Sequence, residues 1–245
     1  MTLIEEFVSQ WQNEDAVTGI LLTGSYALEM QTELSDIDFR IIMSEAYNNP
    51  KKITEVVEGK TFSYMIGNSA FYEAMLQQQY HFNIKTEART FYIGTIQYEK
   101  DKALSSLKNR AQEYLERPFL PLKSEAYDKL VYELYTLEEK YLKKEVHFKK
   151  VAYYLDLKRI FDIYSELLNN EKIIDIGKLN TILEDANYRS IYHYNLHIDS
   201  KFIRMWKEFE NAETINFSKN IQTLIVYIRT ELKMETTQEF IINPY

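Results

Sequence analysis

The stretch LTGSYALEMQTELSDIDFRIIM, residues 22–43, decides the fold. One apolar run ends in it at the dipeptide Gly24-Ser25, and a second apolar run begins in it with Asp36 and Asp38. Short apolar runs rich in isoleucine and leucine predict buried strands. The stretch therefore predicts two core strands joined through a turn of small residues, with a pair of carboxylates where the second strand begins.

The carboxylates fall on one face of that second strand. Side chains alternate between the faces of a strand, so Ile37 and Phe39 point into the core while Asp36, Asp38 and Arg40 share the other face. With their Cα atoms about 7 Å apart, the two carboxylates repel each other unless a cation lies between them. Mg²⁺, or Mn²⁺, prefers such oxygen ligands. We therefore expect Asp36 and Asp38 to bind a divalent metal, and Arg40 either to steer a phosphate group or to neutralise the two carboxylates.

The turn before the pair has the character of a phosphate-binding segment. Gly24 has no Cβ, so backbone can approach a ligand there. Ser25 opens a short helical stretch whose free N–H groups favour phosphate, and its hydroxyl can donate a further hydrogen bond. A phosphate cradle beside a metal site suits phosphoryl or nucleotidyl transfer, in which positioning and charge neutralisation carry most of the catalysis.

The composition of the chain limits the classes of protein to which it can belong. The chain has 245 residues, a formal net charge of −8 and no cysteine, so we expect a reducing, cytoplasmic location and no disulfide or thiolate metal site. No apolar stretch approaches the length of a membrane span. The acidic balance argues against general nucleic-acid binding and suits a cationic substrate. The oligomeric state is left open, and a dimer is compatible with the sequence.

Two of the four prolines lie in RPFLPLKS, residues 117–124, where helical patterns stop. We expect an α+β protein: an α/β domain, residues 1–117, with a small mixed sheet flanked by helices, then a C-terminal helical bundle in residues 118–245, ending in a tail beyond about residue 235. Predicted strands are 17–23, 36–43, 60–66 and 89–98. Predicted helices are 2–12, 26–31, 69–79 with Ser69 as N-cap, 100–115, 125–146, 150–168, 178–186, 200–210 and 218–233.

The opening stretch resembles the signature of the DNA polymerase β-like nucleotidyltransferase superfamily. Small bacterial members carry Gly-Ser-x-Ala followed by Ser-Asp-x-Asp on an apolar strand, and here these are residues 24–27 and 35–38. The resemblance covers residues 1 to about 115, and the overall plan is similar to that of the small aminoglycoside and lincosamide nucleotidyltransferases. It implies a metal-dependent enzyme that moves a nucleoside monophosphate from a nucleoside triphosphate onto a hydroxyl and releases pyrophosphate.

The chain departs from the family pattern at the third carboxylate. Family members usually carry Asp or Glu on the next strand, but Ser63, Tyr64 and Met65 stand at the matching positions. The antibiotic enzymes also place a catalytic Glu on a helix after the first domain, and Glu133 is the candidate general base by that resemblance.

Three functions remain open on the sequence. The first is transfer of AMP from ATP onto a small-molecule hydroxyl, with an antibiotic among the acceptors. The second is the same chemistry on a protein target, as in toxin–antitoxin members of the superfamily. The third is a catalytically weak module that binds nucleotide without the third carboxylate.

Overall fold

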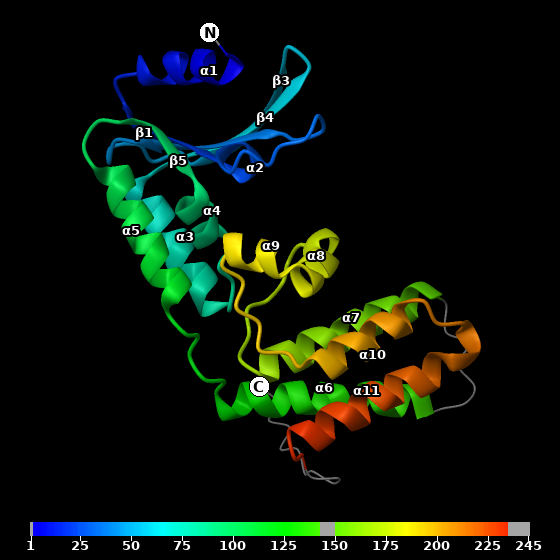
Figure 1. The fold of residues 1–245 in the computed structure, drawn as a ribbon. Coiled ribbons are helices and arrows are strands. Elements are labelled where there is room, and N and C mark those ends of the chain that lie inside the picture. Colours follow the sequence, from blue (N-terminus) through cyan, green and yellow to red (C-terminus); the bar gives the residue numbers. More distant parts are fainter. Residues whose placement is uncertain (1, 143–149, 235–245) are drawn as a thin grey trace. The chain divides into compact units, whose positions relative to one another are not determined.

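A computed structural model describes residues 2–142 and 150–234 of the chain (Figure 1). It divides into two compact units, each described by itself below. The first comprises Met1–Pro118 with Ser190–His193, and the second comprises Phe119–Arg189 with Tyr194–Tyr245. The predicted tail beyond about residue 235 lies outside the described residues.

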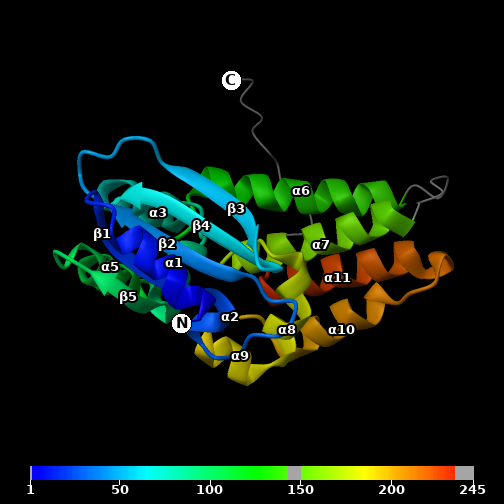
Figure 2. The ribbon, with the colours of Figure 1, turned by 90° about the horizontal axis from the view of Figure 1, so that it is seen from above.

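A five-stranded mixed sheet forms the centre of the first unit. Its strand order is β3-β4-β2-β1-β5, with β3 and β5 at the edges (Figure 2). The pair β2–β4 is parallel, and the other three pairs are antiparallel. The elements of this unit are α1 (Leu3–Gln12), β1 (Val17–Thr23), α2 (Gly24–Ala27), β2 (Ile37–Met43), β3 (Lys51–Val57), β4 (Lys60–Asn68), α3 (Ser69–His81), α4 (Thr86–Ile93), β5 (Thr95–Glu99) and α5 (Ala103–Glu116).

Helices cover both faces of this sheet. Helix α1 lies on one face, while α3, α4 and α5 lie on the other (Figure 1). The α1 face is closed by aromatic packing, because the ring of Phe7 stacks on those of Phe39 and Phe62 at centroid distances of 4.5 and 5.1 Å. Burial of three such rings supplies much of the hydrophobic stabilisation of this layer. The predicted alternation on β2 is present: Ile37 and Phe39 are buried, and Asp38 and Arg40 are half-buried on the opposite face.

The predicted strand over residues 89–98 is wrong in its first half. Residues up to Ile93 belong to α4, and the strand β5 begins at Thr95. Ala88 and Phe91, three residues apart, are buried together as on one face of a helix. Lys108 then donates from Nζ to the carbonyl oxygens of Phe91 and Tyr92 at 2.8 and 3.0 Å, which satisfies the free acceptors where the helix ends.

Two further local features differ from expectation. The N-cap of α3 is Asn68 rather than Ser69, because the Asn68 side chain accepts a hydrogen bond from the backbone N–H of Phe71 at 2.8 Å.

Strand β3 is absent from the elements that the sequence predicts. Its residues are mostly exposed on both faces, so the alternation of apolar and polar residues that marks a strand is missing.

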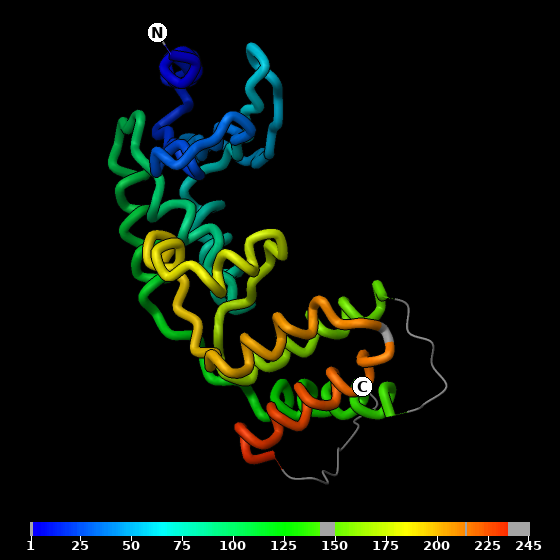
Figure 3. Tube along the Cα trace, turned by 45° about the vertical axis from the view of Figure 1, so that its right-hand side comes forward, coloured from blue at the N-terminus to red at the C-terminus, as the bar shows by residue number. Residues whose placement is uncertain are grey.

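The second unit is helical throughout its described elements. Helix α11 packs against α6, α7 and α10 around a continuous apolar core, and its run beside these helices can be followed in Figure 3. In the described part of the chain no helix combines the length and apolarity needed to cross a bilayer. The elements are α6 (Ser124–Leu142), α7 (Lys150–Leu167), η1 (Ile176–Lys178), α8 (Leu179–Glu184), α9 (Ala186–Ile191, which ends in the first unit), α10 (Ser200–Glu210), η2 (Thr214–Asn216) and α11 (Phe217–Glu231).

Candidate functional site

The chain bends sharply where β1 meets α2. Gly24 has φ +69°, a left-handed conformation that glycine adopts without steric cost. Its N–H donates to Oγ1 of Thr23 at 2.6 Å, and the Thr23 hydroxyl donates to the carbonyl of Thr90 at 3.3 Å, which fixes the bend to α4. A Cβ placed on Gly24 would lie 2.7 Å from Oδ2 of Asp38. The Asp38 carboxylate therefore faces the bend, at a distance that only a glycine permits.

The charges around Asp38 favour a bound cation. Burial raises the pKa of the Asp38 carboxyl above its usual range, and the nearby Asp36 carboxylate raises it further. The charges of Arg40 and Lys52 oppose this rise without cancelling it. Asp36 is exposed immediately before β2, so the pair is open to solvent on one side. A divalent ion held by both carboxylates would remove the repulsion that the protein's own charges leave.

The donor set fits one metal ion that shares its remaining ligands with phosphate. Among the described residues, no group of three or more His, Asp or Glu side chains is arranged to hold a metal by itself. Mg²⁺ commonly takes one or two carboxylates and completes its shell with water and substrate phosphate oxygens. Asp36 and Asp38 match that requirement, and the Asp38 carboxylate lies directly beside the glycine bend.

The strand register shows which of the candidate positions on β4 lies beside Asp38. Asp38 pairs with Thr23 on β1 and with Ser63 on β4, and Ser63 pairs in turn with Thr54 on β3. Paired side chains lie on the same face, so these residues form one polar row across the sheet. Tyr64 projects to the opposite face, where its hydroxyl donates to Glu55 at 2.8 Å. Of the candidate positions on β4, Ser63 is therefore the one beside Asp38.

Arg40 pairs with Glu87, a residue that no sequence pattern singles out. Its Nε and Nη2 atoms donate to the two carboxylate oxygens of Glu87 at 2.6 and 3.0 Å, and Nη1 donates to the carbonyl of Phe39 at 3.2 Å. The two charged side chains are only 15% and 3% exposed. Bidentate pairing of this kind fixes the guanidinium plane. A role for Arg40 in contacting phosphate stays a prediction.

Glu133 lies on α6, in the second unit. Arg159 donates to both of its carboxylate oxygens, from Nε at 2.6 Å and from Nη2 at 2.5 Å. This hydrogen bonding holds the pKa of Glu133 below its usual range. A carboxylate with a lowered pKa is a weaker base, so release from Arg159 would have to accompany any proton abstraction. The structure brings Gly24, Asp36, Asp38 and Arg40 together in the first unit, with Ser25 next to Gly24 on the bend.

Comparison with known proteins gives one family match, which spans nearly the whole chain. The family model described as "Nucleotidyltransferase domain" matches residues 1–242. Among solved structures, the chain is similar to a nucleotidyltransferase-like protein from Exiguobacterium sibiricum 255-15, with 9% sequence identity and a TM-score of 0.42. That alignment covers 93% of this chain and 73% of the other. The chain matches no curated protein.

Proposed function

Because the chain belongs to the nucleotidyltransferase domain family of polymerase β-like proteins, we propose that it transfers AMP from ATP onto a hydroxyl of a small molecule. The observation that carries the proposal is the carboxylate of Asp38 turned toward Gly24, so that the metal-binding pair and the phosphate-binding bend form one site. The absence of cysteine is in keeping with a reaction in the reducing cytoplasm.

Each residue of the site has a separate task in this proposal. Asp36 and Asp38 hold Mg²⁺ or Mn²⁺, which when bound neutralises the triphosphate and orients it. Gly24 admits the phosphates close to the backbone, and the Ser25 hydroxyl donates a hydrogen bond to a phosphate oxygen. Arg40 supplies positive charge near Asp38, which lowers the pKa of the Asp38 carboxyl and so favours its ionised form.

The bond changes follow from the family reaction. The acceptor hydroxyl oxygen forms a bond to the α-phosphorus, the bond from that phosphorus to the bridging oxygen breaks, and pyrophosphate leaves with the bonding electron pair. The hydroxyl proton passes to a base, for which Glu133 is the candidate once it separates from Arg159. We propose a cationic acceptor, with aminoglycosides among the acceptors to test, because the chain has a net charge of −8.

The direct test is transfer of label from [α-³²P]ATP in the presence of Mg²⁺ to a panel of aminoglycosides and lincosamides. The proposal expects one labelled acceptor and one pyrophosphate per turnover, with both lost in the Asp38→Asn variant. Label appearing on a protein and on none of the small molecules would replace the proposed acceptor with a protein target. ATP binding without transfer to any acceptor would overturn the enzymatic proposal.

A second candidate function is a nucleotide-binding module with weak or no catalysis. Two observations favour it: Ser63 stands in the row beside Asp38 where the family places a carboxylate, and Glu133 is held by Arg159. In that case Ser63→Asp should create transfer activity that the wild-type chain lacks. A wild-type chain that already turns over at a rate typical of enzymes, at least about 1 per second, would exclude this second function.

A further inference from the structure

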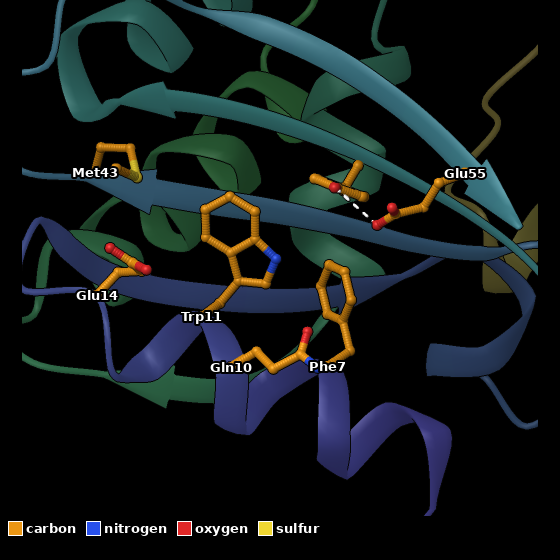
Figure 4. Close-up of a pocket in the computed structure, with 7 residues that line it drawn as sticks. Phe7, Gln10, Trp11, Glu14, Met43 and Glu55 are labelled. Atoms are coloured by element: carbon orange, nitrogen blue, oxygen red, sulfur yellow. Dashed lines mark hydrogen bonds between the residues drawn. The ribbon is translucent and has the colours of Figure 1, made fainter. Parts of the chain in front are cut away.

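A pocket lies on the α1 face of the sheet, opposite the face that carries Asp38. Its volume is about 430 Å³, which is enough for a small organic molecule. It lies at the C-terminal part of α1, over β2, β4 and β3 (Figure 4). The lining residues are Phe7, Gln10, Trp11, Glu14, Met43, Glu55 and Tyr64. None of these residues has a part in the function proposed above.

Three aromatic rings make the apolar wall of this pocket. The Trp11 and Tyr64 rings meet edge to face, with a centroid distance of 5.7 Å and an interplanar angle of 70°. Phe7 meets Tyr64 in the same manner, at 5.1 Å and 67°. Phe7 and Tyr64 are buried, whereas Trp11 is only partly covered, so Trp11 offers ring surface to a ligand. Aromatic rings set at steep angles to one another suit an organic cation, which the ring quadrupoles attract.

Two carboxylates supply the charge of the pocket. In Figure 4, Glu14 and Glu55 lie on opposite sides of the Trp11 ring. The Tyr64 hydroxyl donates to Oε1 of Glu55 at 2.8 Å, and burial together with this hydrogen bond raises the pKa of Tyr64 to about 12. Tyr64 therefore stays protonated and holds the Glu55 carboxylate in place. No Lys or Arg is among the residues that line the pocket in the described part of the chain, so its charge is negative.

From these features we propose that the pocket binds an aliphatic diamine or a related alkylammonium ion. The two ammonium groups pair with Glu14 and Glu55, and the methylene chain lies on the Trp11 ring. An anion would be repelled by the two carboxylates, and none of the lining residues is a Lys or Arg that could pair with it. A metal ion would gain no ligands from the aromatic wall, and the described residues offer no group of three His, Asp or Glu side chains for it. The proposal concerns a different face of the sheet and does not depend on nucleotide transfer.

The test is isothermal titration calorimetry of the full chain with 1,4-diaminobutane, with 1,4-butanediol as the uncharged probe of the same length. We expect saturable binding of the diamine at about millimolar concentration and none of the diol. Glu14→Gln and Glu55→Gln should each weaken binding by about threefold and together by about tenfold. Glu6→Gln is the control, because Glu6 is exposed on α1, the helix that carries Trp11, and does not line the pocket.

A second control separates this pocket from the aspartate pair, which could also attract a diamine. The Asp36→Asn/Asp38→Asn variant should keep wild-type diamine binding, whereas the Glu14→Gln/Glu55→Gln variant should bind the diamine about tenfold more weakly. Near-ultraviolet circular dichroism establishes that each variant is folded. The proposal is overturned by equal heats for diamine and diol, by absence of saturable binding, or by loss of binding in the aspartate variant alone.

Discussion

Replacing Gly24 by alanine tests whether the bend and Asp38 form a single site. Gly24 has φ +69°, and an L-residue in that conformation costs about 1–2 kcal/mol relative to glycine. The new Cβ would also lie 2.7 Å from Oδ2 of Asp38, so the carboxylate must move. That movement is small in energy, since a carboxylate is the free end of a side chain, but it removes one of the two ligands proposed for the metal.

The chain contains a matched control for the backbone strain. Gly59 has φ +79°, and a Cβ there would meet nothing within 4 Å. Both Gly24→Ala and Gly59→Ala should therefore lower Tm by about 2–4 °C for each kcal/mol of strain. Only Gly24→Ala should weaken binding of the Mg²⁺–ATP complex, by at least about tenfold, equivalent to about 1.4 kcal/mol.

The assay is a titration with a fluorescent ATP analogue in the presence of Mg²⁺, run beside thermal unfolding of both variants. If Gly24→Ala loses stability as expected but binds the nucleotide as tightly as wild type, the contact between the bend and Asp38 has no part in binding. Equal loss of nucleotide affinity in Gly59→Ala would also refute the reasoning, because that position is open space.

Three other substitutions probe the same face of the sheet. Because the pKa of Asp38 is raised in the folded state, its contribution to stability is present at low pH and is lost as the pH rises through that pKa. The metal-free Asp38→Asn variant should therefore have a higher Tm than wild type at pH 7. The difference in Tm should shrink toward pH ~4. Glu87→Gln leaves the Arg40 charge buried without its partner and should lower the free energy of unfolding by about 3 kcal/mol, measured by urea denaturation; a change below about 1 kcal/mol would show that the ion pair contributes little. Ser63→Asp should strengthen Mg²⁺-dependent nucleotide binding on the order of tenfold in calorimetry, and unchanged or weaker binding would place the third ligand elsewhere.

The parts of the fold that the sequence predicted are those with a strong hydrophobic pattern. Three such elements are β1, β2 and α1, each of which packs one or both of its faces into the core. The spacing of their apolar residues therefore predicts them. The edge strand β3 was missed because exposed residues on both faces carry no such pattern. The run from Arg89 to Ile93 fits a strand or a helix by its short apolar pattern, and in the structure it is helical and packs against β1.

The candidate site likewise has a part that the sequence predicts and a part that it does not. The sequence pattern predicts Gly24 and Asp38 in one site, and they meet because Gly24 directly follows β1 while Asp38 lies on β2, the strand paired with β1. The ion pair between Arg40 and Glu87 could not be predicted, because its partners are 47 residues apart and meet only through the packing of α4 on the sheet. The choice of Ser63 among the positions on β4 likewise needed the strand register, which the sequence alone does not supply.

The central claim is that Asp36 and Asp38 hold a divalent ion that binds a nucleoside triphosphate at the bend of Gly24 and Ser25. Calorimetric titration of the full chain with a non-hydrolysable ATP analogue, with Mg²⁺ and then with EDTA, measures this directly. We predict saturable binding with Mg²⁺, none with EDTA, and at least about tenfold weaker binding in the Asp36→Asn/Asp38→Asn variant. Equal binding with and without Mg²⁺, or wild-type binding in that variant, would contradict the claim.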